Sequence, residues 1–192
     1  MNKESRIQAL LNEKRISYNP DGDFVEGNRV RGLYDLIQEC FEPDFVVVEI
    51  GSCEGSSAEL FALTCGKVYA IDPWEGVAHS NGPIELAMSR QSEKTCRVRL
   101  NKYNNVEIIK GLAEEEVNSF KDRSVDAVYI DGAHDPASVA KDINMWLPKI
   151  KDGGVLCGHD WRTAEVRNVV LKMFGGVNKI YKDGSWAIIL KK

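Results

Sequence analysis

The sequence predicts an α/β fold: a doubly wound, Rossmann-like, mostly parallel sheet of seven strands with helices on both faces. Short apolar runs alternate with helical segments between residues 45 and 174, the pattern of strand–helix–strand units with right-handed crossovers. The first run, Phe45–Ile50, is almost wholly apolar, as expected of a strand buried on both faces. Asp183-Gly184 separates the last two apolar runs, which predicts a hairpin and an antiparallel last strand.

Composition narrows the class of protein. The chain has 192 residues, enough for one domain with a short extension, and its 25 basic and 29 acidic residues give a net charge of −4. This balance argues against a protein that grips nucleic acid through its phosphates. No apolar run approaches the roughly 18 residues that cross a bilayer. The five cysteines form no CxxC pair, so we expect reduced thiols and a cytoplasmic location.

The pattern divides the chain into two parts of one domain. Residues 1–44 are predicted to form an N-terminal helical extension, with one helix before the turn sequence Asn19–Gly22 and another over about Asn28–Cys40. Residues 45–192 are predicted to form the main domain. Its expected helices are Ser57–Cys65, Pro83–Tyr103, one whose first turn holds Glu114–Glu116, Pro136–Leu147 and Ala164–Phe174. Its expected strands are Phe45–Ile50, Lys67–Ile71, Val106–Ile109, Val125–Ile130, Val155–Gly158, Val177–Tyr181 and Trp186–Leu190.

A glycine-containing loop follows the first strand. Two glycines four residues apart allow a tight turn and a close approach of backbone to a ligand, and the next helix offers free N–H groups. The loop lacks the GxGxxG fingerprint, and a plain strand-to-helix turn is the alternative. With an acidic residue at the strand end, it predicts a nucleotide-type ligand. The binding residues expected here are Glu49, Gly51, Ser52, Gly55, Ser56 and Ser57.

Two further strand ends complete the expected ligand site. Asp72 follows the second strand, 23 residues after Glu49, where a carboxylate accepts hydrogen bonds from ribose hydroxyls. Before Pro73 it would also suit a turn. Trp74 is placed to stack on a flat heterocycle or to pack in the core, and Gly111 and Ala113 let backbone approach the ligand after the third strand.

Acids and imidazoles follow the fourth and fifth strands. These strands should be neighbours, so Asp131, His134, His159 and Asp160 should converge at one edge of the sheet. Oxygen and imidazole ligands suit a divalent ion such as Mg²⁺, and the same groups suit proton transfer. Caps and turns are the alternative, and Asp135 before Pro136 is expected to cap a helix.

With these residues in place, the chain resembles class I S-adenosylmethionine-dependent methyltransferases from about Val46 to Leu190. The loop Glu49–Gly55 matches the cofactor loop of that superfamily, Asp72 matches its ribose-binding acid, and the terminal hairpin matches its antiparallel seventh strand. The resemblance implies the strand order 3-2-1-4-5-7-6 and S-adenosylmethionine as cofactor, with Asp131 also close to it.

The segments Asp131–His134 and His159-Asp160 resemble small-molecule O-methyltransferases of the catechol and macrocin types. That resemblance implies a divalent ion held by Asp131, His159 and Asp160, and methyl transfer to a hydroxyl of a small molecule. It also implies that His134 is the general base beside Asp131, although the catechol-type family usually has lysine there. Imidazoles at His134 and His159 would make activity depend on pH near neutrality, or would transfer protons without a metal.

Two alternatives stay open. A hydroxylase-like relative would bind iron through Asp131, His134 and His159, a set of two imidazoles and one carboxylate. A non-catalytic module would bind S-adenosylmethionine and act by association. The expected partner is a small-molecule acceptor, with neither nucleic acid nor membrane, and a homo-oligomer is left open. Residues 75–83 are predicted to be a mobile lid.

Overall fold

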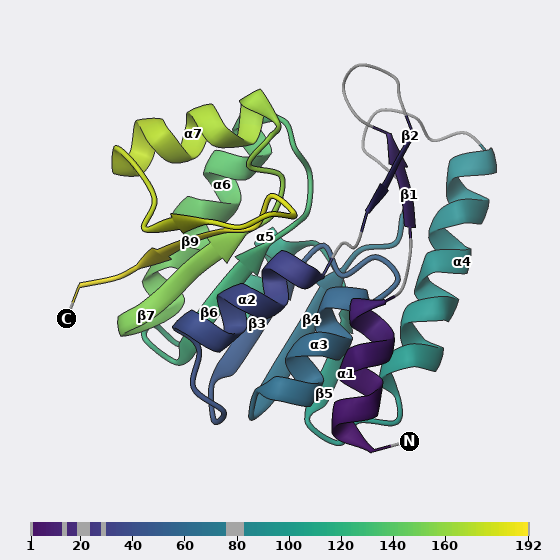
Figure 1. Cartoon of the computed structure of the whole chain (residues 1–192). Coiled ribbons are helices and arrows are strands. Elements are labelled where there is room, and N and C mark those ends of the chain that lie inside the picture. The colour runs from purple at the N-terminus through teal and green to yellow at the C-terminus, as the bar shows by residue number, and fades with distance from the viewer. Residues whose placement is uncertain (1, 13–14, 19–23, 28–29, 76–82, 192) are drawn as a thin grey trace.

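A computed structural model describes residues 2–12, 15–18, 24–27, 30–75 and 83–191 of the chain (Figure 1). All of the predicted lid except its two ends, Glu75 and Pro83, lies outside these residues, as does the predicted break at Asn19–Gly22. No helix in the described ranges combines the length and the apolarity that a membrane span requires.

The main sheet has seven strands in the order β5-β4-β3-β6-β7-β9-β8. Five of them are parallel, β9 runs antiparallel to β7, and β8 runs antiparallel to β9. Counted within this sheet the order is 3-2-1-4-5-7-6, which confirms the predicted topology. The strands are β3 (Val46–Ile50), β4 (Lys67–Asp72), β5 (Val106–Lys110), β6 (Val125–Ile130), β7 (Ile150–Gly158), β8 (Lys179–Ile180) and β9 (Trp186–Ile189).

Helices cover both faces of this sheet (Figure 1). One face packs against α1 (Lys3–Leu11), α2 (Arg31–Cys40), α3 (Ser56–Thr64) and α4 (Pro83–Leu100). The other face packs against α5 (Ala113–Glu116), α6 (Pro136–Trp146) and α7 (Ala164–Phe174), with the 3₁₀ turns η1 (Val117–Ser119) and η2 (Leu147–Lys149). In β3, Val47 faces the first layer and Val48 the second, and neither is exposed. A strand between two layers must be apolar on both sides, which explains the almost wholly apolar run.

The N-terminal part differs from the predicted helical extension. Helix α1 ends at Leu11, and the strands β1 (Arg15–Tyr18) and β2 (Phe24–Gly27) form an antiparallel hairpin of their own. The prediction of helices alone was therefore wrong here. Aromatic and β-branched residues on both sides of Pro20-Asp21-Gly22 are the hairpin signal that the helical interpretation overlooked.

Strand β7 also begins earlier than predicted. It starts at Ile150 instead of Val155, and its pairing with β6 shifts register between Val125 and Ala127. Gly153 has φ +79° in this stretch, a conformation that glycine adopts without strain. Gly153 and Gly154 thus form an irregularity inside the strand, just before its predicted start at Val155.

Candidate functional site

The carboxyl ends of β3, β4, β6 and β7 meet at one edge of the sheet, where ligands bind in folds of this kind. The loop after β3 lies against the loop after β6. Gly51 has φ +88°, and a Cβ atom there would lie 2.2 Å from the backbone oxygen of Asp131. Gly55, with φ +76°, is the N-cap residue of α3, and a Cβ there would lie 3.0 Å from the Cys96 sulfur. Both glycines are required by the backbone and its neighbours.

Glu49 brings a buried carboxyl group to this loop. Its side chain lies at the end of β3 with 0% exposure, and neither oxygen has a well-oriented hydrogen-bond partner among the described residues. Burial raises the pKa of Glu49 to about 7, although the nearby hydroxyls of Ser52 and Ser57 lower it in part. The Ser52 hydroxyl is also buried without such a partner. Buried polar groups are normally satisfied, so this loop is suited to a ligand that supplies donors.

Asp72 joins the loop after β3 to the turn after β4. Its Oδ2 accepts a hydrogen bond from the Cys53 N–H at 2.8 Å, and its Oδ1 accepts one from the Trp74 N–H at 2.8 Å. Burial raises the pKa of Asp72. Cys53 and Trp74 both have positive φ, 47° and 46°, and such strain in non-glycine residues gathers at functional sites.

The Trp74 side chain is buried in this structure. It is 5% exposed, its indole N–H donates to the Cys53 carbonyl at 2.8 Å, and the Arg97 guanidinium lies 5.9 Å from the ring centre. Adenine stacking on Trp74 therefore stays a prediction. Next to this turn, the Gly111 N–H donates to the Asp72 carbonyl at 3.3 Å, and Ala113 begins α5.

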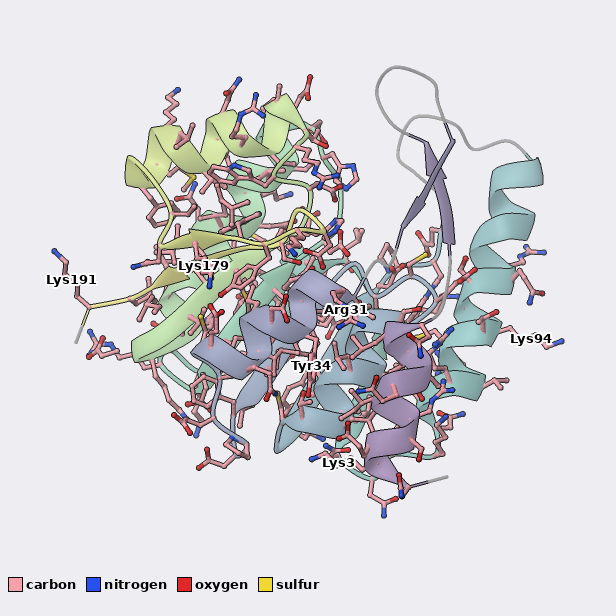
Figure 2. All side chains as sticks on the ribbon, viewed as in Figure 1. Lys3, Arg31, Tyr34, Lys94, Lys179 and Lys191 are labelled. Carbon is pink, nitrogen blue, oxygen red and sulfur yellow. The ribbon has the colours of Figure 1, made fainter. Side chains whose placement is uncertain are left out.

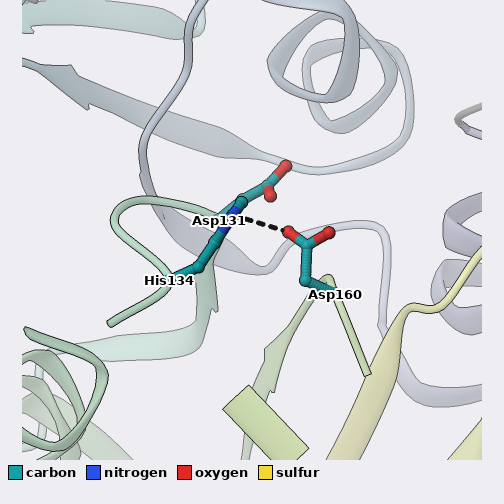
Figure 3. A group of neighbouring side chains, drawn as sticks. All are labelled: Asp131, His134 and Asp160. Atoms are coloured by element: carbon teal, nitrogen blue, oxygen red, sulfur yellow. Dashed lines mark ion pairs between the residues drawn. The ribbon is translucent and has the colours of Figure 1, made fainter. Parts of the chain in front are cut away.

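Three predicted residues come together after β6 and β7 (Figure 3). Asp131, His134 and Asp160 each offer a ligand atom, and these atoms lie within 4.8 Å of one another. His134 Nε2 lies 2.8 Å from Asp160 Oδ2. Asp160 has φ +57°, a conformation that aspartate tolerates better than most residues. The group can therefore hold a divalent cation or transfer a proton.

The charges within the group shift its pKa values in opposite directions. The hydrogen bond with Asp160 raises the pKa of His134. Burial raises the pKa of Asp160, but the bonds from His134 and His159 outweigh it and leave that pKa well below its usual range. Burial, with the nearby charge of Asp160, raises the pKa of Asp131 despite the opposing charge of His159.

His159 lies behind the group. Its Nδ1 is 3.3 Å from Asp160 Oδ1 and 3.8 Å from Asp131 Oδ1, whereas its Nε2 is buried without a hydrogen-bond partner among the described residues. Burial lowers the pKa of His159, but the two carboxylates raise it to about 9 overall. The predicted ligand set of Asp131, His159 and Asp160 thus differs from the gathered set by one residue, because His134 occupies the third corner. The predicted iron set, which needs both imidazoles, is not the set that converges in the described chain.

One charged cluster was missed by the sequence analysis. Glu59 in α3 is fully buried and bound by cations from α1 and from the end of α4. The available signal was an acid inside the apolar stretch Ala58–Leu63, because an acid is rarely buried without a partner.

Residues 48–161, more than half of the chain, match the family described as a methyltransferase domain. A protein of Acanthamoeba polyphaga mimivirus is 26% identical over 190 residues, which are 95% of this chain and 80% of that protein. A protein of Sinorhizobium fredii is 27% identical over 126 residues, 62% of this chain, and the match spans only 13% of that protein's length.

Solved structures show the same fold. An rRNA methylase from Streptococcus thermophilus superposes with a TM-score of 0.60 at 18% identity, covering 86% of this chain and 98% of the methylase. The O-methyltransferase TomG from Streptomyces achromogenes, solved with S-adenosylmethionine, gives 0.57 at 17% identity, covering 82% of this chain and 78% of TomG. Together with the strand order and the glycine loop, the family match shows that the chain belongs to the methyltransferase domain family, as an S-adenosylmethionine-dependent domain on the class I Rossmann-like fold.

Proposed function

We propose that this chain transfers the methyl group of S-adenosylmethionine to a hydroxyl group of a small molecule, with His134 as general base. The observation that carries the proposal is the contact between Gly51 and the backbone of Asp131. It brings the cofactor loop against the loop that bears Asp131 and His134. A proton acceptor is therefore available beside the place where a methyl group would be delivered.

The residues of the loop fit the cofactor. The Gly51 backbone leaves no room for a side chain. The Glu49 carboxyl and the Ser52 hydroxyl, which lack well-oriented partners among the described residues, suit a ligand that carries an amino group. Asp72 would bind the ribose, as its carboxylate lies at the end of the neighbouring strand. When bound, S-adenosylmethionine supplies an activated methyl group on a sulfonium.

In the proposed reaction, the acceptor oxygen forms a bond to the methyl carbon as the carbon–sulfur bond breaks, and S-adenosylhomocysteine leaves. The hydroxyl proton passes to His134. Because Nε2 of His134 faces Asp160 at 2.8 Å, the other ring nitrogen, Nδ1, would receive the proton. Asp160 would then stabilise the resulting imidazolium, which makes it a positioning residue for the base.

A divalent ion is the second candidate for activating the acceptor. Two carboxylates and an imidazole within 4.8 Å are a plausible partial shell for Mg²⁺ or Mn²⁺. Such an ion would lower the pKa of a bound hydroxyl. Metal binding by His134 would prevent it from acting as base, so the two candidates predict different dependence on metal. TomG is an O-methyltransferase that shares the fold of this chain at 17% identity. That likeness is compatible with a small-molecule hydroxyl as the methyl acceptor.

The proposal is tested with methyl-labelled S-adenosylmethionine and a panel of acceptors that includes catechol, with and without EDTA. We expect His134→Gln to lower turnover roughly 10²–10⁴-fold while the Kd for S-adenosylhomocysteine stays within twofold. The matched control is Asp152→Asn, at an exposed carboxylate near the start of β7, and it should retain full activity. Loss of activity in EDTA, restored by Mg²⁺, would favour the metal candidate over the base.

The non-catalytic alternative is decided by the same experiment. A protein that binds S-adenosylhomocysteine but methylates no acceptor, with Asp131→Asn and His134→Gln indistinguishable from wild type in every assay, would act as a binding module. Cofactor binding without iron-dependent oxygen consumption would separate methyl transfer from the hydroxylase alternative.

A further inference from the structure

Glu59 is a buried carboxylate that the proposed reaction does not use. It lies in α3 one turn after Gly55, and its backbone N–H donates to the Gly55 carbonyl at 2.9 Å. Its side chain has 0% exposure. Burying a carboxylate is strongly destabilising unless it is paired, so the groups that pair with Glu59 indicate which segments this residue holds together.

The partners of Glu59 come from two other segments. From α1, Arg6 donates through Nε at 2.8 Å and through Nη2 at 2.5 Å. From the end of α4 and the following turn, Arg99 Nη1 lies at 3.1 Å, Lys102 Nζ at 2.8 Å and the Tyr103 hydroxyl at 2.7 Å. The forked Arg6 contact is the geometry in which a guanidinium binds a carboxylate most specifically. Glu59 therefore links α1 to α3, the helix that follows the loop after β3.

The position of α1 matters because the β1–β2 hairpin comes next in the chain. This hairpin forms a separate two-stranded sheet, and Figure 1 shows it rising beyond the carboxyl ends of the main sheet, on the side of β4 and α4. A two-stranded hairpin is marginally stable alone, so its placement depends on the helices at its ends. Helix α2, after the hairpin, is held by the Asp183 carboxylate, which accepts from the Leu33 N–H at 2.8 Å. Helix α1, before it, is held by Arg6 and Glu59.

We propose that the Arg6–Glu59 pair is a positioning contact that holds α1 and the β1–β2 hairpin at the cofactor end of the sheet and so slows release of S-adenosylhomocysteine. The inference rests on the proposed function, because the ligand must bind at the glycine loop. Release would proceed through a state in which α1 is undocked, so its rate would scale with the population of that state. The apolar residues Ile7, Leu10 and Leu11, which pack against the first layer, would keep α1 attached without the ion pair, but less firmly.

The test uses Arg6→Gln, which leaves Glu59 paired with Arg99, Lys102 and Tyr103 and so spares the fold. Lys3→Gln is the matched control, because Lys3, labelled in Figure 2, is exposed on the same helix and carries the same charge. Stopped-flow dissociation of S-adenosylhomocysteine is measured for both, with amide hydrogen exchange of the apo protein. We expect Arg6→Gln to dissociate about tenfold faster, equivalent to about 1.4 kcal/mol, with association little changed. Arg6→Lys, which keeps the charge but loses the fork, should be intermediate.

Hydrogen exchange distinguishes positioning from a general loss of structure. In Arg6→Gln the amides of α1, β1 and β2 should exchange faster, while those of residues 51–55 should be unchanged. Equal dissociation rates in wild type and Arg6→Gln would overturn the inference. So would faster exchange in the cofactor loop in place of the hairpin, or an equal effect of Lys3→Gln. A wild-type protein that does not bind S-adenosylhomocysteine at all would instead overturn the proposed function, and the inference with it.

Discussion

Replacing Gly51 with alanine would incur two costs that glycine avoids in the loop after β3. The first is conformational, because Gly51 has φ +88°, where a Cβ atom is unfavourable by about 1–2 kcal/mol. The second is steric, because the new Cβ would lie 2.2 Å from the Asp131 backbone oxygen. The positions of the Cβ atom and of the Asp131 oxygen are both fixed by the backbone, so the two loops must move apart. We expect this to add about 1–3 kcal/mol, the usual cost of overpacking.

Gly175 provides the matched control for this prediction. It has φ +74° at the end of α7, and a Cβ there would meet nothing within 4 Å. Gly175→Ala should therefore lower the free energy of unfolding by about 1–2 kcal/mol, and Gly51→Ala by about 2–5 kcal/mol, both measured by urea denaturation. Calorimetry should show that only Gly51→Ala weakens S-adenosylhomocysteine binding, by at least about tenfold. Equal losses of stability in the two variants, or unchanged binding by Gly51→Ala, would refute the reasoning.

Two further predictions concern carboxylates. Asp72→Ala should weaken S-adenosylhomocysteine binding by about 1.5–3 kcal/mol, the range for hydrogen bonds to a charged group; unchanged affinity in calorimetry would mean that the ribose lies elsewhere. Burial raises the pKa of Glu59, but the bonds from Arg6, Lys102 and Tyr103 outweigh it and lower that pKa from 4.5 to about 2. The ionised Glu59 carboxylate thus adds about 2–3 kcal/mol to the free energy of unfolding, after allowance for its partly exposed partners. This contribution is complete above pH 4.5 and is lost as pH falls toward 2. Urea denaturation between pH 2 and 6 should show this loss in wild type and not in Glu59→Gln.

The topology could be predicted because few arrangements satisfy the sequence pattern. Apolar runs separated by helices require a parallel sheet with both faces covered, and Asp183-Gly184 turns the chain back for an antiparallel last strand. The approximate place of the candidate site follows from the same geometry, since residues after parallel strands share one edge. Asp131 and Asp160 could therefore be expected near each other from the sequence alone.

The hairpin and the Glu59 cluster could not be derived in this way. Strands of four residues carry too little periodicity to compete with a helical interpretation, so the turn sequence Pro20-Asp21-Gly22 between aromatic and β-branched residues was the one local signal for the hairpin. The partners of Glu59 lie 53 positions before it, at Arg6, and 40 to 44 positions after it, at Arg99 and Tyr103. Pairings at such separations depend on how α1, α3 and α4 pack, which no local pattern encodes.

His134, and not the predicted His159, completes the group with Asp131 and Asp160. The cause is local and just as hard to predict. His159 still follows the course of β7, and its N–H donates to the Ile130 carbonyl at 3.0 Å. Asp160 then turns away with φ +57°, so regular strand alternation no longer determines where its carboxylate lies. One of its oxygens meets His134 and the other meets His159. Asp160 therefore contacts one imidazole that is half exposed and one that is mostly buried. That difference in exposure supports the proposal that His134, and not His159, takes the proton of the acceptor.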